Sequence, residues 1–125
     1  MMDTILQGLV LLSSLFLAGL GIRTVFVPKS MVEVLDIGIE TAAGLNTVRG
    51  FLGGLFIGSS VILVTGLVTG NTTFFLAVAM TMSAVVFGRW VGIAGDGFDR
   101  KIGFPLVMEM IMVTIFVVAY TYLGV

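Results

Sequence analysis

Asn46 and Arg49 stand at the start of an apolar segment, "LNTVRGFLGGLFIGSS" (45–60), that is long enough to enter a membrane. If a helix begins here, Asn46 is its N-cap and Arg49 is its third residue. A guanidinium beside the free N–H groups of a helix start provides the donors of an anion site. Asn46, Arg49 and Gly53 also share one helix face, because they are three and four residues apart. The pattern predicts binding of an anionic group.

A second candidate site is an ion pair between two later apolar segments. In a helical hairpin, residues at equal distance from the middle of the loop lie at similar depth. Arg89 and Glu109 are equidistant from position 99, close to the middle of the loop at 95–103. A charged residue near the middle of a membrane helix costs about 2.5–3.5 kcal/mol on insertion scales. We therefore expect Arg89 and Glu109 to pair.

Arg23 and Arg49 are likewise equidistant from position 36, and three interpretations of these two cations stay open. In the first, they anchor the helices to lipid phosphates at the membrane surface. In the second, they pair with nearby carboxylates, for which the candidates are Glu33, Asp36, Glu40, Asp96 and Asp99. In the third, they line a pocket for the anionic head of a lipid-like ligand. Asn46 and the depth of Glu109 favour the pocket, since an anchor needs neither.

The favoured function is therefore binding of an amphipathic small molecule with an anionic head, without a cofactor or a metal. Arg49 and Arg89 hold the head, Asn46 donates to it, and Glu109 orients Arg89. The predicted ligand-binding residues are Asn46, Arg49, Arg89, Asp96 and Glu109. One alternative is a membrane isomerase or cyclase for a terpenoid or lipid, with Glu109 as general acid or base. The other alternative is a structural or accessory membrane subunit.

The composition of the chain indicates that lipid surrounds it. Of 125 residues, 58% are hydrophobic and only 10% are charged, against about a quarter in ordinary globular proteins. Such a chain cannot cover itself with polar surface, so lipid must be its solvent. The absence of cysteine and histidine excludes disulfides, thiolate nucleophiles and imidazole catalysis. A net charge of −1 excludes nucleic acid as a partner.

The apolar segments predict an all-α fold, a single transmembrane domain (1–125) that forms a four-helix bundle. The expected spans are residues 5–27, 46–69, 73–94 and 104–123, with Pro105 in the first turn of the last one. Between the first two spans, Ser30 and Glu33 fit a capping box. Residues of that segment separate into an apolar face (Met31, Val34, Leu35, Ala42) and an acidic face (Glu33, Asp36, Glu40). This pattern predicts a short interfacial helix.

All six basic residues lie at one end of the predicted bundle (Arg23, Lys29, Arg49, Arg89, Arg100, Lys101). The positive-inside rule makes that end cytoplasmic and places both termini outside.

Two stripes of small residues recur at every fourth position, Gly50, Gly54 and Gly58 on the second span and Ala84, Gly88 and Gly92 on the third. Small residues at this spacing let membrane helices approach closely. We expect the stripes to pack inside the bundle. The alternative is that one stripe faces a second copy of the chain, in a homo-oligomer.

The segments "AGLNTVRGFLGGLFIG" (43–58) and "FGRWVGIAGDG" (87–97), a short first loop with a proline, and a glutamate in the fourth span resemble the domain of unknown function 4345 family. The resemblance covers nearly the whole chain. It implies a small bacterial protein with four transmembrane helices, and hence the inner membrane, with membrane lipid as its surroundings. It implies no established activity.

Overall fold

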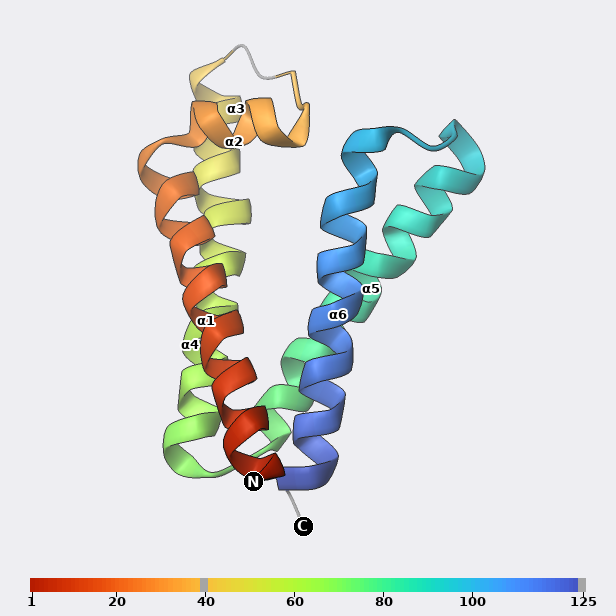
Figure 1. Ribbon diagram of the computed structural model, residues 1–125. Coiled ribbons are helices and arrows are strands. Elements are labelled where there is room, and N and C mark those ends of the chain that lie inside the picture. The colour runs from red at the N-terminus through yellow and green to blue at the C-terminus, as the bar shows by residue number, and fades with distance from the viewer. Residues whose placement is uncertain (39–40, 124–125) are drawn as a thin grey trace. The chain divides into compact units, whose positions relative to one another are not determined.

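The computed structural model describes residues 1–38 and 41–123, and within these residues it is all-α (Figure 1). The helices are α1 (Met2–Phe26), α2 (Pro28–Leu35), α3 (Ala42–Thr47), the π-helical turn η1 (Val48–Gly53), α4 (Gly54–Thr69), α5 (Thr73–Asp96) and α6 (Arg100–Leu123). Because α3, η1 and α4 follow one another directly, they form one continuous helix. The predicted all-α fold is confirmed.

Within the described residues, four helices are long and apolar enough to cross a membrane: α1, the continuous helix Ala42–Thr69, α5 and α6. They contain 24 to 28 residues each. At 1.5 Å per residue this is about 36–42 Å, more than the roughly 30 Å of a hydrocarbon core. The chain is therefore a multi-pass membrane protein with the four predicted spans. The second and fourth helices begin four residues earlier than expected, at Ala42 and Arg100.

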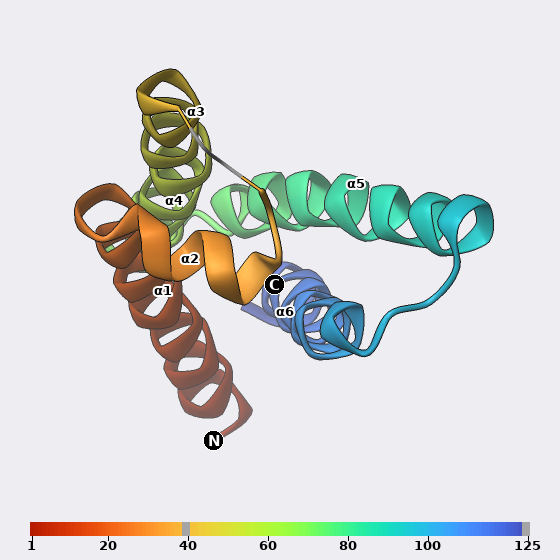
Figure 2. The same cartoon turned by 90° about the horizontal axis from the view of Figure 1, so that it is seen from above.

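The chain divides into two compact units, Leu12–Val61 and Met1–Leu11 with Ile62–Val125. The first unit contains a hairpin of the part of α1 from Leu12 onward and the part of the continuous second helix up to Val61, with α2 lying across its end at a steep angle (Figure 2). The second unit contains the hairpin of α5 and α6. These two helices pack against each other and diverge toward the loop at 97–99 (Figure 1; Figure 2).

In the first unit, the helices meet at a pair of glycines. A Cβ atom on Gly21 would lie 2.5 Å from Cγ1 of Ile57, and one on Gly53 would lie 2.6 Å from Cγ2 of Val25. Nearer the middle of the chain's first span, the hydroxyl of Ser60 donates to the backbone oxygen of Ser14 (2.8 Å). The two backbones therefore approach so closely that neither glycine has room for a side chain.

The predicted stripes do not form this contact. A Cβ atom would meet no described atom within 4 Å at the five glycines of the stripes, Gly50, Gly54, Gly58, Gly88 and Gly92. Ala84 is exposed. The role of the stripes in packing or in a homo-oligomer stays a prediction.

The short helix α2 confirms the expected element between the first two spans but not its predicted cap. Met31 is buried and Glu33 is exposed, as the predicted faces require, but Val34 of the predicted apolar face is 54% exposed. However, Val27 is the N-cap and Pro28 is the first helical residue. Ser30 therefore lies inside the first turn, where its hydroxyl donates to the backbone oxygen of Val27 (2.9 Å), so the predicted capping box is wrong.

The helix also ends early, at Leu35, with Asp36 in the left-handed conformation (φ 57°). Ala42, predicted on the apolar face of this helix, instead begins α3. Glu40, predicted on its acidic face, lies outside the described residues.

Side-chain hydrogen bonds lie at the starts of α5 and α6. A turn at Gly70-Asn71 separates α4 from α5: Gly70 has a φ of 71°, and the side-chain oxygen of Asn71 accepts from the backbone N–H of Thr73 (3.1 Å). Asp99 accepts from the backbone N–H of Lys101 (2.9 Å) and starts α6 at Arg100. Pro105 was predicted in the first turn of this helix, but it lies inside the helix, because the helix begins one turn earlier, after Asp99.

Candidate functional site

The five residues predicted to bind a ligand are divided between the two units. Asn46 and Arg49 belong to Leu12–Val61, whereas Arg89, Asp96 and Glu109 belong to the other unit. Each group has its own geometry, and the pocket common to both stays a prediction.

Asn46 does not cap the second span. Thr41 is the N-cap of α3, with an extended backbone and a hydroxyl that accepts from the backbone N–H of Gly44 (3.0 Å). Asn46 is the fifth residue of the helix and is exposed. Arg49 is the eighth residue of the continuous helix, beyond the free N–H groups of its first turn. The predicted cap role of Asn46 and the predicted place of Arg49 as third helical residue are therefore wrong, whereas anion binding by these two residues stays a prediction.

Arg49 instead contacts the C-terminal end of the neighbouring helix, α1. Its Nη1 donates to the backbone oxygen of Val25 (2.6 Å), in the last turn of α1. The last four carbonyls of a helix have no partner inside the helix, and a cation there also meets the negative end of the helix dipole. The C-terminal end of α1 thus stabilises the positive charge of Arg49. Arg49 lies in η1, and π-helical turns occur frequently at functional sites.

Arg23 stabilises the connection that follows α1. Its Nε donates to the hydroxyl of Ser30 (2.9 Å), and that hydroxyl donates in turn to the backbone oxygen of Val27. The acceptor of Arg49 lies two residues from Arg23, in agreement with the equal depth that the loop symmetry predicts. The sequence did not predict that Ser30 accepts a hydrogen bond from Arg23. The signal in the sequence is that Ser30 follows Arg23 by seven residues, with Pro28 between them.

The pairing of Arg89 with Glu109 is confirmed. The Nε atom of Arg89 lies 2.7 Å from one carboxylate oxygen of Glu109 and 2.8 Å from the other. The side chains are 28% and 14% exposed. Arg89 is seven residues before the end of α5 and Glu109 is nine residues after the start of α6, about 10 and 13 Å along the helix axes. The ion pair thus bridges the two helices well inside the span.

A hollow of about 260 Å³ lies between α5 and α6, and neither Arg89 nor Glu109 lines it. Its walls are formed by Ser83 and Val86 of α5 and by Met110, Val113 and Thr114 of α6. Val86 is three residues before Arg89, and Val113 is four residues after Glu109. Since residues at these spacings are neighbours on one helix face, the hollow lies one helical turn farther from the loop than the ion pair.

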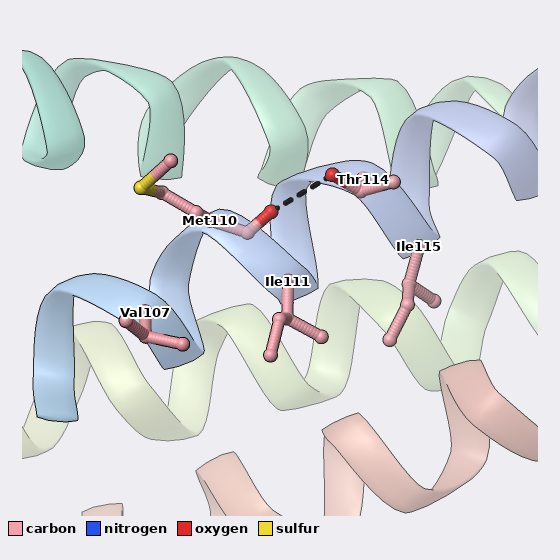
Figure 3. A pocket seen from close by; sticks show the side chains of 5 residues that line it. All are labelled: Val107, Met110, Ile111, Thr114 and Ile115. Atoms are coloured by element: carbon pink, nitrogen blue, oxygen red, sulfur yellow. Dashed lines mark hydrogen bonds between the residues drawn. The ribbon is translucent and has the colours of Figure 1, made fainter.

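A second, larger hollow of about 360 Å³ runs along α6 (Figure 3). Val107, Ile111 and Ile115 extend from one side of the helix, while Met110 and Thr114 lie on the other side and line both hollows (Figure 3). All five lining residues lack a charge, so this hollow is no candidate for an anionic head.

Asp96 is exposed at the end of α5. Seven residues separate it from Arg89, which is about 10 Å along the helix. The described residues therefore do not bring Asp96 to the ion pair.

No family model, no curated protein and no solved structure matches this chain. The resemblance to the domain of unknown function 4345 family stays a prediction.

Proposed function

We propose that this membrane protein binds an amphipathic, lipid-like small molecule with an anionic head. The observation that carries the proposal is the Arg89–Glu109 pair, which lies inside the α5–α6 hairpin beside a hollow. Ionisable residues within membrane spans are costly, and they commonly mark ligand or ion pathways. A polar group at one end of an apolar hollow matches the two ends of an amphiphile.

The geometry of the pair supports a division of roles. Glu109 engages Nε of Arg89 and so fixes the plane of the guanidinium. The N–H groups on Nη1 and Nη2 form the outer fork of that plane, which suits a carboxylate or a phosphate. Glu109 is the positioning residue, and Arg89 receives the head. In a low-dielectric setting, such a charge-assisted contact is stronger than in water.

The proposal includes the orientation in the bacterial inner membrane. If each of the four long helices crosses once, the connections at 27–41 and 97–99 lie on one side and the turn at 70–72 on the other. The basic residues lie near the first two connections, which favours the cytoplasm for that side and the outside for both termini. The head of the ligand then faces the cytoplasmic half.

The same geometry disfavours the enzyme alternative. Both oxygens of Glu109 lie within 2.8 Å of Nε of Arg89. To act as a general acid or base, the carboxyl group would have to leave this pair and turn toward a substrate.

The accessory-subunit alternative has one specific observation in its favour, the open space at Gly50, Gly54 and Gly58 within the described chain. Replacing Gly54 or Gly58 with Leu would then abolish assembly, as seen by native mass spectrometry, whereas Arg49→Ala would leave it intact. Unchanged assembly in the glycine variants would exclude this alternative.

Native mass spectrometry of protein purified in a mild detergent tests the binding function. We expect a defined anionic amphiphile at a fixed stoichiometry in the wild type and its loss in the double variant R89Q/E109Q. The double substitution removes the cation without leaving the carboxylate alone. The matched control is Arg100→Gln, which removes an exposed cation at the start of α6. Bulk phospholipid alone, or equal retention in the double variant, would refute the proposed function.

A further inference from the structure

The hollow between α5 and α6 has a defined position relative to the ion pair. Counted from the loop, Arg89 and Glu109 come first, and Val86 and Val113 follow one turn deeper. Val86 is ten residues from the end of α5, about 15 Å along the axis and thus near the middle of a core of roughly 30 Å. The hollow is therefore in a position to receive the apolar part of a ligand whose head contacts Arg89.

The walls of the hollow suit apolar atoms. Val86, Met110 and Val113 are apolar, and the unbranched methionine side chain adapts to irregular shapes. The two hydroxyl groups donate hydrogen bonds within their own helices: Ser83 donates to the backbone oxygen of Ala79 (2.7 Å), and Thr114 donates to that of Met110 (3.0 Å). These hydroxyls need no partner from a ligand.

The size of the hollow limits what it accepts. Its volume is about 260 Å³, and the hollow is partly open and not an enclosed cavity. Along the axis the lining residues extend over three positions of α5 and four of α6, about 5–6 Å. An acyl chain of a bilayer lipid extends through half of the roughly 30 Å core, about 15 Å. The lined part of the hollow is therefore shorter than an acyl chain and matches the length of a compact group.

We infer that the ligand of this site is an anionic amphiphile with a compact apolar body, such as a fused-ring or short branched hydrocarbon, and not a long-chain lipid. The inference rests on the proposed function, because the ligand's head is placed at Arg89. It adds that Val86 and Val113 select the apolar body by its shape.

The test measures binding of three probes to the full-length protein in a neutral detergent. The probes are adamantane-1-carboxylate, which is compact and anionic, adamantane-1-carboxamide, which is compact and neutral, and palmitate, which is long and anionic. Trp90, the one tryptophan of the chain and the neighbour of Arg89, serves as the fluorescent reporter. We expect saturable binding of adamantane-1-carboxylate at least tenfold tighter than that of either other probe.

Two variants fill the hollow and leave the ion pair in place, Val113→Phe and, as a second choice if the first does not fold, Ser83→Leu. Each is expected to weaken binding of adamantane-1-carboxylate at least tenfold. Ile111→Phe is the matched control, because Ile111 lines only the other hollow on α6. Its binding should stay within twofold of the wild type.

The outcomes separate the inference from the proposed function. Palmitate binding that needs Arg89, without preference for the compact anion, would overturn the inference and leave the proposed function standing. Binding of the compact anion that both filling variants leave unchanged would also overturn the inference. If neither anion binds in a manner that R89Q/E109Q abolishes, the proposed function fails as well.

Discussion

Replacing Glu109 with Gln should destabilise the protein by about 2 kcal/mol. Removing one partner of a fully buried ion pair costs about 3–5 kcal/mol, because the other charge is left without compensation. An arginine at the centre of a membrane helix costs about 2.5–3.5 kcal/mol on insertion scales, and less toward the interface. The Arg89 side chain is 28% exposed and about 10 Å from the helix end, so the expected cost falls below both ranges, at about 2 kcal/mol.

A double-mutant cycle isolates the contribution of the pair. Glu109→Gln, Arg89→Gln and R89Q/E109Q are compared with the wild type by reversible unfolding in mixed micelles of increasing dodecyl sulfate content. Helical circular dichroism follows the transition. Since the double variant leaves no unpaired charge, it should be more stable than the sum of the single changes predicts, by about 1–2 kcal/mol.

The control is again Arg100→Gln, at an exposed position at the start of α6, which should change stability by less than about 0.5 kcal/mol. Additivity of the two single changes within about 0.3–0.5 kcal/mol would refute the argument, because the ion pair would then contribute nothing of its own.

Three further predictions concern the first unit and the orientation. Gly53→Leu should destabilise by about 1–3 kcal/mol or separate α1 from its neighbour, because no side chain fits there, whereas Gly54→Leu should be tolerated in the same unfolding assay. Thr41→Ala should lower the free energy of unfolding by about 1 kcal/mol through loss of the cap, whereas Asn46→Ala should change it little. An equal or larger loss of stability in Asn46→Ala would contradict the assignment of Thr41 as the cap. Because the chain has no cysteine, single cysteines can be introduced at Asn46 and Asn71 and labelled with an impermeant maleimide. The cysteine at position 46 should react from the cytoplasmic side and the one at position 71 from the outside. Labelling from the opposite sides would refute the proposed orientation.

The hairpin register could be predicted from the sequence, whereas the helix start could not. Arg89 and Glu109 pair because a short loop fixes which residues of two antiparallel helices lie at equal depth. Hydropathy marks where the apolar segment begins but not where the helix begins. Thr41 and the two alanines after it extend the helix beyond the apolar region, so Asn46 lost the capping role that its residue type suggested.

The glycine contacts show a second limit. A repeat of small residues identifies a face on which helices can approach, but it does not say which partner uses that face. In the first unit, the approach needs only one glycine from each helix, Gly21 and Gly53, and neither belongs to the predicted stripes. The choice depends on how the side chains of Val25 and Ile57 fill the space beside them, which is a property of two helices together.

The Arg89–Glu109 pair also bears on how the chain enters the membrane during synthesis. Both residues belong to one hairpin with a loop of only three residues, so they meet as soon as that hairpin forms. If α5 and α6 leave the translocon together, they enter lipid as an electrically balanced unit, and neither charge has to wait for the earlier spans. If they left one at a time, each helix would bear the insertion cost of its own charge, about 2.5–3.5 kcal/mol near the helix centre. The placement of the two charges thus favours biogenesis by hairpins.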